Sequence, residues 1–496
     1  MKHYDVIIIG SGLSGLSCAL ILAKEGRRVC LIERHHIAGG CLQTFHRKGY
    51  CFDTGVHYVG SLDEGQIMRQ FLRYFGVEKS IHLQRLDENA FEVININGRV
   101  YKLPLGKERY IEALCRYFPE DSEGIRAFVN LIMEVKDSIS VDLLKSGCIN
   151  IDEYQRYMSV SVDEMICSHV TNEDLRGVLA GSSLLYGGEK ETSSFYVYAM
   201  VVGSNIEGSY KFIGGTQSLA DAMVGEIHRH GGDIICGNGV KRLAVEDGQI
   251  AYALLDNGDT LTADKYISTL HPAVTFDIVD HVLPIKKAYR TRLNELKNTF
   301  GVFTVYIGMK PAYKRYDNTN IFIHTSNDTW SNQQKVIDGN WSMMVCEQPD
   351  ESMQWTHTIV LHIPMYKSQT QQWEESSVLH RGEEYNAWKE AWVEKCLQRY
   401  EEHYESFRDG IDYICTSSPL TYRDYTGTPA GTAYGIIKNC HNPLPTMFSV
   451  KTKLPNLLLS GQSLYVHGII GVTMTATVTC AELLGNEYLA KRITEK

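Results

Sequence analysis

Three glycines near the N-terminus, Gly10, Gly12 and Gly15, have the spacing of a dinucleotide-binding turn. In such a turn the first glycine permits a tight bend, the second lets the backbone approach a pyrophosphate, and the third lets a helix pack closely on a strand. The start of that helix offers unpaired N–H groups and a partial positive charge to phosphate. We therefore predict that a diphosphate lies against Gly10, Ser11, Gly12, Leu13, Ser14 and Gly15.

A carboxylate follows at the distance expected for a ribose contact. Glu33 stands about 20 residues beyond the glycines, where an acidic side chain can accept hydrogen bonds from ribose hydroxyls. Its negative charge would repel a 2′-phosphate, so we predict an adenosine ribose without that group. Arg34 comes next, and Gly39, Gly40 and Cys41 form a second place where bare backbone could approach the cofactor.

The hydrophobic pattern indicates the elements that must position these residues. Residues 4–9 and 28–32 are apolar runs without alternation, as expected of strands that are covered on both faces of a parallel sheet. Between them, apolar residues recur with the helical period until Gly26, which supplies a stop. The glycines therefore lie between a strand and a helix, which is the context that a dinucleotide site requires.

The stretch 454–481 contains no charged residue and is long enough for a transmembrane helix. Pro455, Gly461, Gly468 and Gly471 interrupt it. The pattern therefore favours a strand, a glycine turn and a buried helix over residues 472–484.

Composition limits the class of protein. The chain has 496 residues and a net charge of −10, which favours a large enzyme of two or three units over a nucleic-acid binder with a basic stripe. Its 13 cysteines include no CxxC pair, and the N-terminus lacks the regions of a secretory signal, so we expect a cytoplasmic protein with free thiols. The sequence has no HExxH motif, and we expect no metal site. A second GxGxxG, which a separate nicotinamide-binding domain would carry, is also absent. The sequence therefore does not identify the electron donor or acceptor.

Three segments resemble a known family of flavoproteins. GSGLSGL, IERHHIAGGCLQTF and FDTGVHYVG are similar to the phytoene desaturase, carotenoid isomerase and retinol saturase superfamily, and look closest to the retinol saturase branch. Phytoene desaturases usually carry arginine after the paired glycines, where this chain has Cys41. The resemblance implies tightly and noncovalently bound FAD. It also implies that the Val240 backbone contacts the adenine end, and that NLLLSGQ holds the cofactor through Gly461 and Gln462, followed by Gly471 and Val472.

The resemblance implies an α/β fold with a discontinuous, Rossmann-like FAD-binding domain of the GR2 type and a second, α+β substrate domain. We expect the FAD-binding domain to comprise residues 1–75, 208–280 and 420–496. The substrate domain would comprise 76–207 and 281–419, with helices over 111–118 and 125–135 and a strand over 302–307. Turn signals at Asp247-Gly248 and Asn257-Gly258 predict a β-meander between residues 233 and 268.

The resemblance also implies a redox enzyme that acts on carbon-carbon double bonds of a polyene or isoprenoid lipid. We favour a saturase, while desaturation and redox-neutral isomerisation stay open because all three use the same flavin. An amine oxidase begins similarly, although its cysteine for covalent flavin attachment is not recognisable here. A prenyl-binding module of the GDP-dissociation-inhibitor type, without FAD, is the alternative from a different class.

Flavin carries the redox chemistry, so the protein needs at most a proton donor. The candidates near the cofactor motifs are His57, Tyr58, Tyr434 and His467. Each could equally be a buried side chain that packs in the core and whose polar atom is hydrogen-bonded. A hydrophobic small-molecule substrate predicts peripheral membrane contact. The candidate surface is a basic, amphipathic stretch that contains Lys286, Lys287, Arg290, Arg292 and Lys297.

Overall fold

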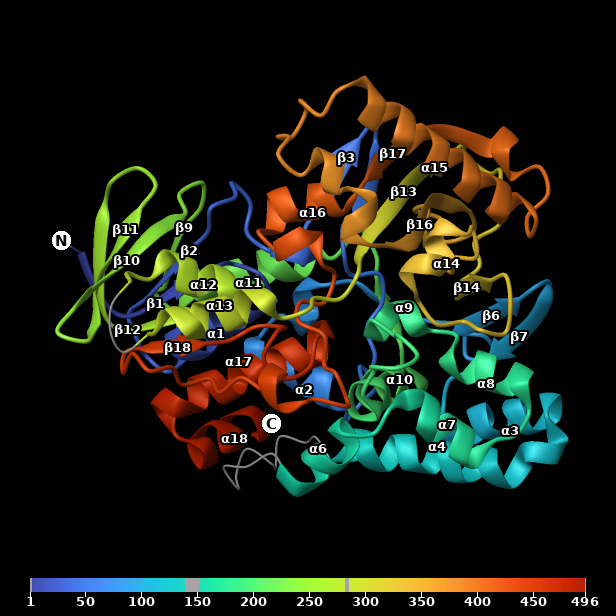
Figure 1. Cartoon of the computed structure of the whole chain (residues 1–496), viewed down its shortest axis with the longest axis horizontal. Coiled ribbons are helices and arrows are strands. Elements are labelled where there is room, and N and C mark those ends of the chain that lie inside the picture. Colours follow the sequence, from blue (N-terminus) through green and yellow to red (C-terminus); the bar gives the residue numbers. More distant parts are fainter. Residues whose placement is uncertain (1, 139–150, 282–284, 496) are drawn as a thin grey trace.

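The computed structural model describes residues 2–138, 151–281 and 285–495. Two units lie side by side, each built on a central sheet (Figure 1). The N-terminal strand and the C-terminal helices belong to the same unit, so the chain leaves this unit and returns to it.

The first sheet has a parallel core and an antiparallel edge. Its strand order is β10-β11-β12-β1-β2-β9, and β18 pairs in parallel with β12. β12, β1, β2 and β9 run parallel, whereas β10, β11 and β12 form the predicted meander. The bounds are β1 Lys2–Ile9, β2 Val29–Ile32, β9 Asp233–Ile235, β10 Val240–Glu246, β11 Gln249–Leu255, β12 Thr260–Ser268 and β18 Leu457–Leu459.

Helices cover this sheet. The helix that follows the glycine turn, α1 (Leu13–Lys24), is buried at every residue up to Ala23, because it packs against β1, β2 and two other helices. Those two helices are α11 (Gln217–Arg229) and α17 (Gly468–Leu484). The same unit contains α2 (Ile67–Phe75), α12 (Pro272–Ile278), α13 (Lys287–Glu295) and α18 (Asn486–Thr494).

The second sheet is antiparallel apart from one parallel pair, β6 with β14. Its order is β17-β13-β16-β15-β14-β6-β7. The bounds are β6 Glu92–Ile96, β7 Arg99–Leu103, β13 Gly301–Met309, β14 Asn320–His324, β15 Met343–Pro349, β16 Thr356–Met365 and β17 Ile411–Ser417. Two small sheets join β3 (Thr44–Arg47) to β4 (Tyr50–Asp53) and β5 (Leu83–Arg85) to β8 (Tyr210–Phe212).

A helical layer lies beside the second sheet and contributes to the largest apolar core of the protein. It consists of α3 (Lys107–Tyr117), α4 (Ser122–Asp137), α6 (Ile151–Met158), α7 (Val162–His169), α8 (Glu173–Ala180), α9 (Ser183–Tyr186) and α10 (Phe195–Glu207). The remaining helices of this unit are α14 (Gln333–Ile337), α15 (Glu383–Glu401) and α16 (Pro419–Thr426).

The predicted elements at 4–9, 28–32, 111–118, 125–135 and 302–307 are confirmed as β1, β2, α3, α4 and β13. The helix predicted over residues 472–484 is α17, which begins four residues earlier than predicted, at Gly468. Among the described residues, no helix is long and apolar enough to cross a membrane. The strands of the first sheet all fall within 1–75, 208–280 and 420–496, while the exact domain limits stay a prediction.

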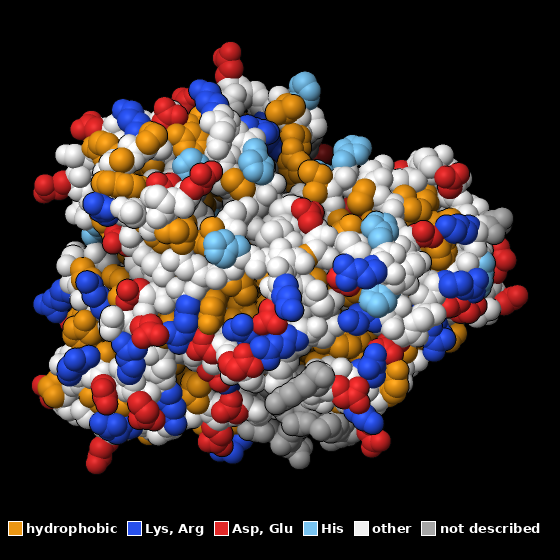
Figure 2. Space-filling view, turned by 180° about the vertical axis from the view of Figure 1, so that it is seen from behind, with side chains coloured by type: hydrophobic (Ala, Val, Ile, Leu, Met, Phe, Trp, Pro, Cys, Tyr) orange, Lys and Arg blue, Asp and Glu red, His pale blue; other side chains and the backbone are white. Residues whose placement is uncertain are grey.

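On one face of the molecule, charges of both signs are mixed (Figure 2). Figure 2 shows acidic and basic side chains interspersed over the face opposite to that of Figure 1. One member of the predicted basic stretch points inward: Arg290 is buried and donates hydrogen bonds to the carbonyl oxygens of Val279 and Asp280. The prediction that Arg290 is part of a surface cluster is therefore wrong, because the guanidinium holds the end of α12 to α13.

Candidate functional site

The carboxyl ends of three parallel strands meet at one point of the first sheet. Gly10 follows β1, Thr269 follows β12 and Gly461 lies two residues beyond β18. Thr269 Oγ1 donates to the Ile9 carbonyl oxygen at 2.9 Å, and a Cβ on Gly461 would lie 3.0 Å from the Thr269 carbonyl oxygen. Ligands of open α/β sheets bind at this edge. Thr269 was missed by the sequence analysis, where its place at the end of a buried strand was the available signal.

The three glycines of the turn serve different purposes. A Cβ on Gly10, whose φ is +93°, would lie 2.7 Å from Thr269 Oγ1, and a Cβ on Gly15 would lie 1.8 Å from the Gly10 carbonyl oxygen. Both are therefore required by the fold itself. No described atom lies within 4 Å of a Cβ on Gly12. Gly12 thus presents bare backbone to open space at the start of α1, which no described side chain caps.

The second pair of glycines lies against the first turn. The Gly39 N–H donates to the Ser11 carbonyl oxygen at 3.0 Å, and a Cβ on Gly40 would lie 3.0 Å from Gly12 Cα. Gly39 and Gly40 have φ values of +128° and +56°, a region that favours glycine. The structure therefore brings the two glycine motifs of the sequence together. Cys41 follows on the same short turn, and burial raises the pKa of its thiol.

Glu33 is held where β2 ends. Its Oε2 accepts hydrogen bonds from Ser11 N at 2.9 Å and Ser11 Oγ at 2.7 Å, and its Oε1 accepts from His35 N at 2.7 Å. The carboxylate is partly exposed and has lone pairs left for ribose hydroxyls. Val240, which begins β10, is half-buried. Arg34 is exposed and donates to the Asp424 carbonyl oxygen at 2.7 Å, and its contact with the cofactor stays a prediction.

The other end of the site is the start of α17. Gly468 has a φ of +78°, and no described atom lies within 4 Å of a Cβ placed on it. No described side chain caps this helix either. Gln462, Gly471 and Val472 are partly accessible beside it, and Ser460 accepts a hydrogen bond from Ser14 of α1 at 2.7 Å. Two uncapped helix starts, α1 and α17, therefore flank the strand ends and would each favour negative charge.

Two of the four candidate acid-base residues form one contact. The rings of Tyr434 and His467 stack with centroids 4.3 Å apart. The Tyr434 hydroxyl donates to the Leu184 carbonyl oxygen at 2.7 Å, and His467 Nε2 lies 3.2 Å from the Leu185 carbonyl oxygen. Burial lowers the pKa of His467 to about 4 and raises that of Tyr434.

His57 contacts a histidine that the sequence analysis missed. Its ring centroid lies 4.3 Å from that of His362 on β16, and the Nε2 atoms of both rings are buried without a described partner. Burial, with the nearby Lys211 ammonium, lowers the pKa of His57 to about 3, so its imidazole is neutral. His362 is held through Thr304, whose hydroxyl lies 3.1 Å from Nδ1. A histidine within the apolar run of residues 359–365 was the signal for it.

Tyr58 contacts a second missed residue. Its hydroxyl donates to Glu92 Oε1 at 2.9 Å, and Glu92 is buried at the start of β6. Burial raises the pKa of Glu92 to about 7 and that of Tyr58 well above its usual value. An acidic residue inside the apolar run of residues 91–96 was the signal that the sequence offered.

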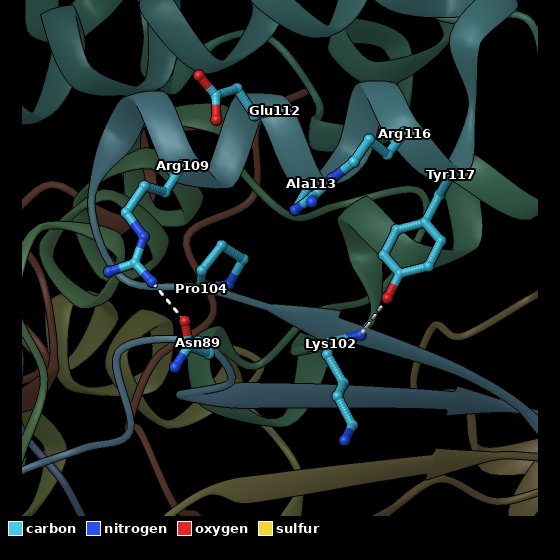
Figure 3. A pocket seen from close by; sticks show the side chains of 8 residues that line it. All are labelled: Asn89, Lys102, Pro104, Arg109, Glu112, Ala113, Arg116 and Tyr117. Atoms are coloured by element: carbon cyan, nitrogen blue, oxygen red, sulfur yellow. Dashed lines mark hydrogen bonds between the residues drawn. The ribbon is translucent and has the colours of Figure 1, made fainter.

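A separate surface cavity of about 400 Å³ lies between α3 and β7 (Figure 3). Arg109 donates there to Asn89 Oδ1 at 2.7 Å. Charged and polar groups dominate its walls, unlike the apolar lining that a lipid substrate requires. Its lining residues are Asn89, Lys102, Pro104, Arg109, Glu112, Ala113, Arg116 and Tyr117. We therefore place the functional site at the strand ends.

A family model described as flavin containing amine oxidoreductase matches residues 13–307, more than half of the chain. The chain belongs to this family. It is 25% identical to all-trans-retinol 13,14-reductase of Danio rerio, over 98% of this chain and 87% of that protein. Prolycopene isomerase 1, chloroplastic, of an Oncidium hybrid cultivar is 23% identical over 97% of this chain and 83% of that protein. The solved structure of an oxidoreductase from Methanosarcina mazei has the same fold, with a TM-score of 0.65 and 16% identity. The match covers 96% of this chain and 99% of that protein.

The protein is an FAD-dependent oxidoreductase, as the sequence analysis predicts. The residues present fit this cofactor, because bare backbone at Gly12 and Gly40, the Glu33 carboxylate and the open start of α17 form one cradle. These residues would hold the diphosphate, the adenosine ribose and the flavin end. When bound, FAD supplies hydride transfer, and the protein's part is to bind, orient, exclude water and move protons.

Proposed function

We propose that this protein reduces a carbon-carbon double bond in a polyene or isoprenoid lipid. The observation that carries the proposal is a partly accessible aromatic edge of the largest apolar core, beside the cofactor motifs. Tyr58, Tyr366 and Tyr434 pack against that core while keeping part of their surface accessible. Tyr366 and Tyr434 both contact the Phe300 ring, and Tyr58 lies near Tyr434. An apolar, elongated substrate is compatible with such a wall.

The likeness to all-trans-retinol 13,14-reductase across nearly the whole chain supports reduction as the direction. Likeness to prolycopene isomerase keeps a redox-neutral isomerisation as the second candidate. The aromatic edge does not distinguish a polyene from an amine, because aromatic faces also attract cations. The likeness to all-trans-retinol 13,14-reductase over 98% of this chain is what favours the double-bond reductase over an amine oxidase.

The test is anaerobic. FAD in the purified protein is reduced with dithionite, and retinoids, carotenoids and simple enones are added in turn while flavin absorbance is followed. A reductase reoxidises its flavin and yields a product heavier by two hydrogens. Product of unchanged mass with altered double-bond geometry would show an isomerase, and hydrogen removal by the oxidised protein would show a desaturase.

We further propose that the protein touches membranes peripherally to reach a lipid substrate. The exposed cations near α13 are Lys286, Lys287, Arg292 and Lys297. They could contact anionic headgroups, at about 1 kcal/mol each near the surface. Flotation with anionic liposomes should weaken when these four residues are replaced by glutamine. Unchanged flotation would exclude this surface.

A further inference from the structure

The hydrogen bond between Tyr58 and Glu92 joins the two units of the protein. Tyr58 follows β4 in the segment that carries the cofactor motifs, and Glu92 begins β6 of the second sheet. Glu92 is only 4% exposed, whereas Tyr58 keeps part of its surface accessible. A phenol that faces the accessible edge is thus backed by a buried carboxyl group.

Among the described residues, the groups that face this pair are uncharged near pH 7, and the buried Lys211 ammonium lies near Cys346. Tyr110 of α3, Tyr186 of α9 and Tyr198 of α10 face Glu92, and Asn320 of β14 is its neighbour across the parallel pair. The Tyr58 side faces Cys346 of β15 and Tyr434. Burial favours the neutral form of Glu92 and raises its pKa to about 7, although the hydrogen bond from Tyr58 opposes this.

After donating a proton, a catalytic residue must take up another one. The hydrogen-bond partners of the four candidate residues decide which of them can do so. Tyr434 donates to a backbone carbonyl oxygen, and His467 lies beside another, neither of which can replace a lost proton. His57 is neutral near pH 7, because burial lowers its pKa to about 3. The partner of Tyr58 is a carboxyl group with a pKa of about 7, which binds and releases a proton at the pH where enzymes operate.

We propose that Tyr58 is the catalytic proton donor for the reduced double bond and that Glu92 is the positioning residue that reprotonates it. This inference rests on the proposed reductase function. One carbon of the double bond accepts a hydride, which reduced FAD supplies, and the π pair moves to the other carbon. The step requires protonated Glu92, whose carboxyl O–H then donates to the Tyr58 oxygen across the 2.9 Å contact and leaves the phenolic O–H free to turn to the substrate. The second carbon takes the proton from Tyr58 as the phenolic O–H bond breaks. The proton of Glu92 moves to the phenolate oxygen, and Glu92 is left as a carboxylate until water reprotonates it.

The kinetic test compares Tyr58→Phe and Glu92→Gln with Tyr101→Phe, which removes a tyrosine hydroxyl from the same core on β7. We expect Tyr58→Phe to slow substrate-driven flavin reoxidation by about 100-fold or more, and Tyr101→Phe to leave it unchanged. In the wild type the rate should fall as pH rises above about 7, because Glu92 must carry its proton. Glu92→Gln should be slower and lose this dependence. A wild-type rate in Tyr58→Phe would overturn the proposal.

A second readout needs no substrate. Infrared difference spectra of the wild type should show a carboxyl C=O band that titrates near pH 7 and is absent in Glu92→Gln. In Tyr58→Phe the band should titrate at higher pH, because the lost hydrogen bond stabilised the carboxylate. If the band titrates at the same pH in Tyr58→Phe as in the wild type, Tyr58 does not stabilise the Glu92 carboxylate, and the proposed pair is contradicted. If no polyene reoxidises the reduced wild type, the proposed function fails, while these spectra still report on the pair.

Discussion

Replacing Gly12 with valine should separate FAD binding from folding. Gly12 has φ −59° and ψ 174°, which any residue adopts, and no described atom lies within 4 Å of an added Cβ. The apoprotein should therefore keep its fold, with a free energy of unfolding within about 1 kcal/mol of the wild type. Valine would nevertheless fill the open space above the backbone at the start of α1.

The expected loss of binding follows from the groups that the valine would cover. A charge-assisted hydrogen bond from a backbone N–H to phosphate contributes roughly 1.5–3 kcal/mol. Losing about two of them weakens binding by at least roughly 3 kcal/mol, or about 100-fold in Kd. Gly15→Ala is the matched control. Its Cβ would lie 1.8 Å from the Gly10 carbonyl oxygen, so it should destabilise the apoprotein by roughly 3 kcal/mol.

FAD titration followed by flavin fluorescence gives Kd, and urea unfolding of both apoproteins gives stability. The reasoning predicts a stable Gly12→Val protein that binds FAD poorly and a Gly15→Ala protein that is unstable. Wild-type affinity in Gly12→Val would refute the placement of the diphosphate. A Gly12→Val apoprotein less stable than Gly15→Ala would refute the assignment of open space to Gly12.

Three further predictions concern other parts of the structure. Glu33→Gln should raise the Kd for FAD about tenfold in the same titration. The amide is uncharged, and its single acceptor oxygen must serve both Ser11 and the ribose, whereas the carboxylate has two. An unchanged Kd would count against the ribose contact. Lys438→Met should cost roughly 3 kcal/mol in urea unfolding at pH 6, where Lys438 is an ammonium although burial lowers its pKa to about 7. The ammonium donates to three backbone carbonyl oxygens at 2.7–2.8 Å, which methionine would leave without a donor, and an unchanged midpoint would contradict this. Stability should fall with pH below about 6.5, because burial lowers the pKa of four histidines to about 3 or 4 and the unfolded chain binds the extra protons; they are His57, His271, His324 and His467. The raised pKa of Glu92, about 7, acts in the opposite direction, because the folded chain binds that proton first, but it offsets roughly one of the four histidines. The loss is about 2 kcal/mol for each histidine at pH 5, and equal unfolding midpoints at pH 5 and pH 7.5 would exclude it.

Local patterns were enough to predict the first unit. The glycine spacing, the apolar runs of β1 and β2 and the turn at Asp247-Gly248 depend on contacts between near neighbours in the chain. Their order also placed Glu33 at a strand end beside the glycine turn, where the structure has it. The residue motifs therefore determined the cofactor class, the α/β fold and the family before any tertiary contact was known.

The chemistry beside the cofactor was decided only by tertiary structure. Tyr58 and Glu92 are 34 residues apart, and Tyr434 is 250 residues from Leu184, whose carbonyl oxygen accepts its hydrogen bond. Sequence periodicity reports which face of an element is buried, but not which buried side chains of different elements meet. Burial and partner together set whether a tyrosine or histidine can exchange a proton, and both arise when the second sheet packs against the segment that follows β4.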